Sequence, residues 1–191
     1  MPLRMRKHML KIQIALLAVI LVLTGCGERA GSELKPRADD KTERWVMSDT
    51  MPSEFDFSVK FGYGEVNKNE VNTYTDTVTK DLIVKGTATA NLALSADEMA
   101  NIYAKMKAIE IMNIDIEPYK PGASTCEQTP YGEDTWKITI DGATRELTWT
   151  DRHCTVSNDA EKLKQLRVDI MKIVAAREEY KALPAAEGGY D

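Results

Sequence analysis

The stretch FDFSVKFGY, residues 55–63, decides the fold because apolar and polar side chains alternate along its whole length. A period of two is typical of a strand with one face in a core and the other in water. The apolar positions are Phe55, Phe57, Val59, Phe61 and Tyr63, and those between them are Asp56, Ser58, Lys60 and Gly62. The sequence therefore predicts a half-buried strand at the start of the folded domain.

A second alternating stretch follows at residues 87–94, after a polar, Asn-rich turn region and a Thr-rich region. One face of this stretch carries Ala88, Ala90, Leu92 and Leu94. We predict a second strand here, and the sequence leaves open whether a third short strand accompanies it.

A β-hairpin is predicted around Asp141-Gly142, because alternating apolar residues lie on both sides of this turn signal. Two registers keep the apolar residues on one face. One has a two-residue loop at Asp141-Gly142. The other has a four-residue loop that sets Ile138 opposite Leu147 and Trp136 opposite Trp149, and we favour it for these side-chain pairs.

Two amphipathic helices complete the domain. The first begins after Ser95, which with Glu98 forms a capping-box pattern, and the second begins near Asn158 and ends near Pro184. Between the first helix and the hairpin, residues 118–134 are predicted to form a loop, with Glu133-Asp134 as surface charge. The prediction is an α+β fold of order ββαββα: a small antiparallel sheet of about four strands covered by two helices.

These elements define one folded domain, residues 53–184, followed by a mobile tail, residues 185–191. Residues 26–52 are polar and without periodicity, which favours a flexible tether. Within it, the apolar patch Trp45-Val46-Met47 either docks on the domain or binds a partner, and docking is the preferred interpretation.

The amino end carries a targeting signal. Four basic side chains precede an apolar run, residues 12–23, which is too short for a membrane-spanning helix of ~20 residues. Residues 1–25 are therefore interpreted as a signal peptide. Leu23-Thr24-Gly25-Cys26 resembles the bacterial lipoprotein signal, and this resemblance implies cleavage before Cys26 and lipid attachment to its thiol. An ordinary secretory signal or a short anchor stays as the alternative.

Composition and charge exclude several classes of protein. The chain has 191 residues, of which 43% are hydrophobic and 29% charged, so a disordered polymer or a polytopic membrane protein is not expected. Removing residues 1–25 takes away four basic and no acidic side chains, so 25 Lys and Arg become 21 against 30 Asp and Glu, a net charge of −9. Nucleic acid is therefore not an expected partner, and membrane contact is expected through the lipid on Cys26 alone.

The two cysteines that remain are predicted to form a disulfide, Cys126–Cys154, because paired cysteines outside the cytoplasm are usually bridged. The alternative is a metal site built from both cysteines, His153 and a carboxylate such as Asp151 or Glu127. The chain has no C-x-x-C or H-x-x-x-H spacing, which argues against such a site. A Cys126/His153 thiol catalyst was considered weaker still.

No catalytic residue and no cofactor is predicted. The chain has no G-x-S-x-G motif and no glycine-rich phosphate loop, and His153 is the only histidine after processing. The aromatic side chains of Trp136 and Trp149 fit either a core or a ligand groove, and core packing is the default.

Several short stretches resemble a group of uncharacterised lipoproteins from Bacillus-like bacteria. They are Asn72-Thr73-Tyr74, Thr79-Lys80-Asp81-Leu82, Leu94-Ser95-Ala96-Asp97-Glu98 and the ending Glu179–Pro184 with Gly188-Gly189-Tyr190. The resemblance implies display on the outer face of a Gram-positive plasma membrane. It implies no catalytic residue.

The leading functional hypothesis is a lipid-anchored, extracytoplasmic, non-enzymatic module that binds an envelope protein or a small ligand. The alternative is an envelope hydrolase whose carboxylates gather only in three dimensions, and a structural or stress-related surface protein is a third possibility. A cleft with two inward carboxylates from different elements favours the enzyme, whereas an exposed apolar patch or a bare strand edge favours the binder.

Overall fold

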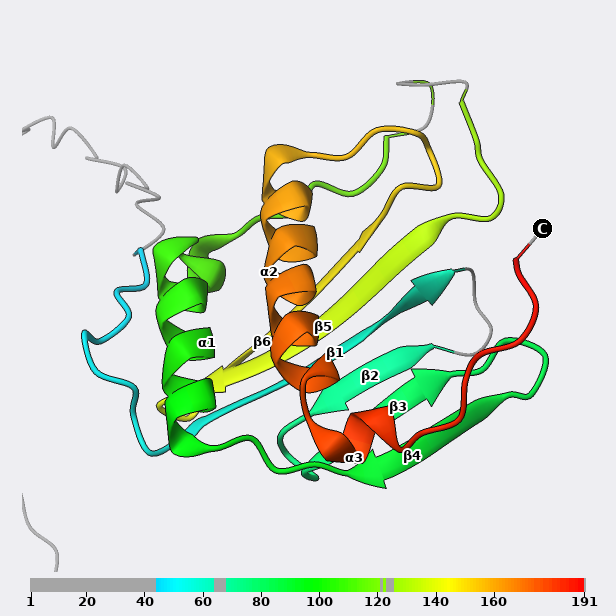
Figure 1. Ribbon diagram of the computed structural model, residues 1–191. Helices are drawn as coiled ribbons and strands as arrows, with labels where there is room; N and C mark the ends of the chain where they lie inside the picture. The colour runs from blue at the N-terminus through cyan, green and yellow to red at the C-terminus, as the bar shows by residue number, and fades with distance from the viewer. Residues whose placement is uncertain (1–43, 64–67, 121, 123–125, 191) are drawn as a thin grey trace, which may run out of the picture. The chain divides into compact units, whose positions relative to one another are not determined.

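The structure is a computed structural model that describes residues 44–63, 68–120, 122 and 126–190 (Figure 1). The predicted signal peptide, Cys26 and residues 27–43 of the predicted tether lie outside this part. The strands are β1 (Phe55–Tyr63), β2 (Asn69–Asn72), β3 (Thr77–Asp81), β4 (Thr87–Asn91), β5 (Gly132–Ile140) and β6 (Ala143–Thr150). The helices are α1 (Ala96–Ala108), the short 3-10 helix η1 (Ile111–Asn113), α2 (Asn158–Ala175) and α3 (Glu178–Lys181).

All six strands form one antiparallel sheet in the order β4-β3-β2-β1-β5-β6. The α+β class is confirmed, but the predicted number of about four strands is wrong. The prediction missed β2 and left open the third short strand, which is β3. Each of these strands buries one valine in the core, Val71 in β2 and Val78 in β3. One buried valine in each strand produces no visible alternation. Pairing of β2 with β1 and of β3 with β2 and β4, rather than local pattern, makes these segments strands.

The two faces of the sheet differ sharply. Helices α1 and α2 cover one face of the sheet (Figure 1). This face carries the core, including the fully buried side chains of Phe57, Val59, Trp136 and Ile138. The opposite face carries exposed polar side chains such as Thr135, Lys137, Thr144, Glu146 and Thr148. The alternation in β1 and β5 thus reports the two faces, as predicted.

Both predicted helices form. Ser95 and Glu98 complete the capping box of α1, which buries Ile102, Tyr103 and Met106. The second helix ends earlier than predicted, because Arg177 adopts an extended conformation and separates α2 from α3. The Arg177 guanidinium donates to Glu98 at the start of α1 at 2.8 Å, a contact that draws the chain away from the axis of α2.

The favoured register of the hairpin is wrong. Trp136 lies opposite Leu147 and Ile138 opposite Arg145, so the loop is the two-residue Asp141-Gly142. Both loop residues have positive φ, 49° and 77°, which is the backbone of a tight turn that matches the twist of two strands. Turn geometry therefore outweighs the side-chain pairs that the longer loop would have made.

Both ends of the described chain contact the domain. Met47 is buried in the core and Ser48 accepts a hydrogen bond from Tyr103, so part of the predicted tether packs on the fold, while Val46 is exposed. In the tail, which we predicted to be mobile, Glu187 forms a bridge with Ile83 and Tyr190 donates a hydrogen bond to Asp81. Within the described residues, no helix is both long and apolar enough to span a bilayer.

Candidate functional site

A cleft of about 400 Å³ lies where β1 and β3 end and β5 begins. We call it the Asp134 cleft. Its lining comes from β1, β3, β5, β6, α2 and the C-terminal tail, and includes Phe61, Tyr63, Asp81, Asp134, Trp149, Asp151, Lys164, Arg167 and Tyr190. Charged and aromatic side chains that are distant in the sequence therefore converge at one end of the sheet.

Asp134 is the most deeply buried charged residue at this site, with 2% of its surface exposed. It lies on the helix-covered face of β5, two positions before Trp136, and so points toward α2. The Nε of Arg167 donates to its carboxylate at 2.8 Å, and the guanidinium lies over the Phe61 ring, 4.9 Å from the ring centre. This ion pair links β5 to α2.

Burial raises the pKa of Asp134 to about 6, even though the charge and hydrogen bond of Arg167 act in the opposite direction. The indole nitrogen of Trp149 also favours the charged carboxylate, but it forms no hydrogen bond of ordinary geometry. Asp134 therefore changes its charge near pH 6, where a small change in surroundings decides its protonation state.

Asp81 is the second buried carboxylate of the cleft, with 7% of its surface exposed. It accepts hydrogen bonds from the backbone N–H of Ile83 at 2.7 Å and from the hydroxyl of Tyr190. Burial and then the Asp81 carboxylate raise the pKa of Tyr190 to about 12, so this phenol stays protonated and donates. The Tyr190 ring also contacts Tyr63, with ring centres 5.6 Å apart.

Asp81 and Asp134 are the only buried charged residues in the part of the chain that the structure describes. They come from β3 and β5, and both line the Asp134 cleft. Each carboxylate accepts from a group of the same chain, so the site is pre-organised. Such a combination of buried charge, basic side chains and aromatic rings is suited to orienting a polar ligand.

The predicted disulfide between Cys126 and Cys154 is confirmed, with Cα atoms 5.9 Å apart. It joins the loop before β5 to the segment after β6, where Gln128 also donates to the carbonyl of Arg152 at 2.9 Å. The bond leaves neither cysteine as a free thiol, so the thiol-catalyst alternative is wrong. It also removes both cysteines from the metal alternative, because a metal would need thiolates.

The other residues of that metal alternative do not form a ligand set. His153 stacks on Tyr119, with ring centres 3.5 Å apart, and its Nδ1 lies 3.8 Å from Glu127. Asp151 instead accepts from the backbone of Gly132 at 2.6 Å. Across the described residues, no group of three or more His, Cys, Asp or Glu side chains is placed to hold a metal ion. A cavity of about 550 Å³ lies beside the Tyr119–His153 stack.

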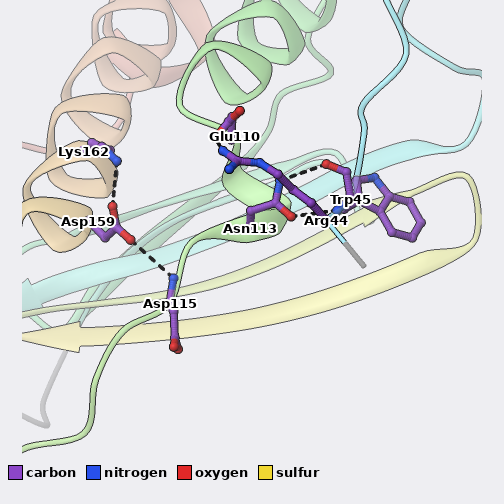
Figure 2. Close-up of polar contacts among 7 residues, drawn as sticks. All are labelled: Arg44, Trp45, Glu110, Asn113, Asp115, Asp159 and Lys162. Carbon is purple, nitrogen blue, oxygen red and sulfur yellow. Dashed lines mark hydrogen bonds and ion pairs between the residues drawn. The ribbon is translucent and has the colours of Figure 1, made fainter. Parts of the chain in front are cut away.

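A third, larger groove of about 810 Å³ lies next to the N-terminal segment. Figure 2 shows how the segment is held: the Asn113 side chain accepts from the backbone N–H of Trp45 and donates to its carbonyl, both at 2.8 Å. Arg44 pairs with Glu110 above it, and Lys162 pairs with Asp159 at 2.7 Å (Figure 2). The Arg44–Glu110 pair and the two Asn113–Trp45 hydrogen bonds hold the segment, so we interpret this groove as the seat of the N-terminal segment.

Replacing Asn113 with Ala is expected to lower the free energy of unfolding by about 1–2 kcal/mol, because two hydrogen bonds to Trp45 are lost. Trp45 should also show a more solvent-exposed fluorescence. The measurement is urea unfolding followed by emission. Asn113→Asp keeps the oxygen that accepts from the Trp45 N–H, so its loss of stability should be smaller. Equal stability of Asn113→Ala and the unchanged protein would rule out this anchoring role.

Sequence reasoning missed the residues of the Asp134 cleft. Asp134 was assigned to a surface loop, which is wrong because β5 begins at Gly132. Its position two residues before Trp136 is the signal that places it on the buried face. Arg167 lies on α2 with its side chain only 20% exposed, and a charged residue on a helix carries no sequence signal of such burial. Asp81 and Tyr190 carried no such signal, since their contact joins β3 to the tail.

Comparison with known proteins adds no identification. No protein-family model matches the chain, and no curated protein matches it. The functional argument therefore depends on the residues described above.

Proposed function

We propose that the chain is a lipid-anchored protein of the outer face of the plasma membrane. The order of basic residues, short apolar run and Leu23-Thr24-Gly25-Cys26 supports signal cleavage and lipid attachment at Cys26. Two acyl chains on one cysteine would suffice for stable anchoring. The Cys126–Cys154 disulfide supports an oxidising location, since such bonds persist mainly outside the cytoplasm.

Replacing Cys26 with Ala is expected to move most of the protein from the membrane to the soluble fraction, because the lipid can no longer attach. Cell fractionation and incorporation of a labelled fatty acid measure this change. Cys126→Ala serves as the matched control and should keep the label. Full membrane retention of the Cys26→Ala variant would contradict lipid anchoring.

We propose further that the domain is a non-enzymatic binding module and that the Asp134 cleft is its binding site. One observation carries this proposal: a buried carboxylate–guanidinium pair, Asp134–Arg167, opens into a cleft with the aromatic side chains of Phe61, Tyr63 and Trp149. Buried charge costs stability, and its placement in a concave site is characteristic of ligand recognition.

Fluorine NMR of the protein labelled with 5-fluorotryptophan tests this binding site, because the chain has three tryptophans in three different places. Trp149 lines the Asp134 cleft and also the cavity beside the Tyr119–His153 stack, Trp136 lies in the core and Trp45 lies at the N-terminal groove. Addition of solubilised envelope material should shift the Trp149 signal and leave that of Trp45 unchanged. Asp81 lines only the Asp134 cleft of these two, so Asp81→Asn should reduce the Trp149 shift. A shift of Trp45 alone would assign binding to the other groove and overturn the proposal.

An envelope hydrolase is the second candidate, because two inward carboxylates from different strands, Asp81 and Asp134, do line one cleft. A pKa near 6 suits Asp134 to general acid or base chemistry. We rank it second because Arg167 and Tyr190 already occupy these carboxylates. A panel of chromogenic ester, phosphate, glycoside and peptide substrates tests it: turnover that disappears in Asp134→Asn would favour the enzyme.

A further inference from the structure

The C-terminal tail binds the domain as an extended peptide would. Its backbone runs beside the loop between β3 and β4 (Figure 1), and Glu187 forms a parallel bridge with Ile83. The N–H of Glu187 donates to the carbonyl of Leu82, and its carbonyl accepts from the N–H of Val84, both at 3.3 Å. Main-chain pairing of this kind is one of the general ways in which proteins hold peptides.

Side chains give this pairing a sequence requirement. Glu187 forms an ion pair with Lys85 at 2.5 Å, and three residues later Tyr190 enters the Asp134 cleft, where Asp81 and Tyr63 contact it. Gly188 has a φ of +94°, and a Cβ there would lie 3.3 Å from a methyl group of Val84. These contacts favour an acidic residue, a glycine directly after it and a tyrosine three positions after the acidic residue.

The loop that receives the tail has an unusual backbone. Ile83 has a φ of 61°, and a positive φ is an outlier for a β-branched residue. Residues in such conformations cluster at functional sites, where the surrounding structure holds them in place. Here the conformation accompanies the hydrogen bond from Ile83 to Asp81 and the bridge to Glu187. The loop that pairs with the tail thus holds Ile83 in a conformation that the loop's own hydrogen bonds maintain.

The tail is held by contacts that open readily. The two backbone hydrogen bonds are long, and the side chains of Lys85 and Glu187 are 53% and 58% exposed, so water screens their attraction. The residues from 185 to 189 are exposed. Segments with few buried contacts open locally without unfolding of the domain.

We propose that the loop of residues 82–86 and the adjoining rim of the Asp134 cleft form a peptide-binding groove that the chain's own tail occupies. An extended segment of a partner protein, carrying an acidic residue and a tyrosine three positions later, displaces the tail. This inference deepens the proposed binding function and depends on it, and it names the class of partner. The tail acts as an internal competitor, because attachment to the same chain gives it a high effective concentration.

The test uses a fluorescent peptide with the sequence AAEGGYD, residues 185–191, and the full chain in two forms. In the Tyr190→Ala chain the internal competitor loses its anchor, so fluorescence anisotropy should report at least tenfold tighter binding than to the unchanged chain. A peptide with alanine in place of its tyrosine should bind at least tenfold more weakly than AAEGGYD. Adding Asp81→Asn to the Tyr190→Ala chain should weaken binding of AAEGGYD. Circular dichroism confirms that each variant is folded.

Two results would overturn the inference. One is no saturable binding of AAEGGYD to the folded Tyr190→Ala chain. The other is a concentration-dependent dimer of the unchanged chain in light scattering that Tyr190→Ala abolishes, which would assign the groove to the tail of a second copy. The failure of the peptide leaves the wider binding proposal standing if the Trp149 fluorine signal still responds to envelope material.

Discussion

Replacing Arg167 with Leu is expected to lower the free energy of unfolding by about 3–5 kcal/mol at pH 7.5, because it leaves the buried Asp134 carboxylate without its partner. Asp134 is 2% exposed, so its carboxylate depends on the guanidinium rather than on water as a partner. The Arg167 guanidinium also lies over the Phe61 ring, and this cation–π contact is lost as well. Urea unfolding of the two proteins measures the difference.

The loss should be smaller at pH 5 than at pH 7.5. The pKa of Asp134 in the folded chain is about 6, above the ~3.9 of an unfolded aspartate, so the folded state binds the proton more tightly. The contribution of this group to stability therefore falls as pH rises from about 4 to about 6 and stays low above that range, by on the order of 2–3 kcal/mol. In the Asp134→Asn background, the stability lost on replacing Arg167 with Leu should no longer depend on pH over this range.

Controls separate the ion pair from a general effect of charge. Lys172 forms an exposed pair with Asp169, so Lys172→Leu should change stability by less than about 1 kcal/mol. The double variant Arg167→Leu with Asp134→Leu should recover most of the loss, since no buried charge remains. Equal losses for the double and the single variant would show that the loss does not come from the unpaired Asp134 charge.

Removal of the disulfide by Cys126→Ala with Cys154→Ala should lower the free energy of unfolding by about 3–4 kcal/mol. The bond spans a sequence separation of 28 residues, and closing this loop restricts the unfolded chain. The loss should appear as a lower urea midpoint. Reduction of the unchanged protein should reproduce it. A non-reduced digest with two free cysteines, or equal midpoints, would contradict a structural disulfide.

Sequence predicted the fold best where pattern and packing agree. Residues 55–63 and the hairpin alternate strictly because one face of each strand meets the helices, and Ser95 with Glu98 caps α1 as the capping pattern requires. The short strands β2 and β3 could not be found this way, since the partner strand rather than their own sequence holds them. The hairpin register was missed because turn geometry was weighed below side-chain pairing.

The candidate site could be predicted from the sequence less well than the fold. The Cys126–Cys154 disulfide followed from the number of cysteines, since only these two remain besides Cys26. By contrast, Asp134 and Arg167 meet across β5 and α2, and Asp81 and Tyr190 are separated by more than a hundred residues of chain. Single-sequence periodicity reports which face a residue occupies, whereas it carries no information on which distant charge faces it. For Asp134, the sequence pattern could have indicated the buried face of β5, but it could not have indicated Arg167 as the partner.

Site-specific photo-crosslinking in the native membrane tests the central claim, that the Asp134 cleft is the binding surface, most directly. A photoreactive residue at Tyr63, half-exposed at the cleft rim, is compared with one at Glu146, exposed on the open face of the sheet. We expect a reproducible crosslinked species from position 63 that Asp81→Asn weakens, and little from position 146. Crosslinks from position 146 alone, or equal yields from both positions, would contradict binding at the cleft.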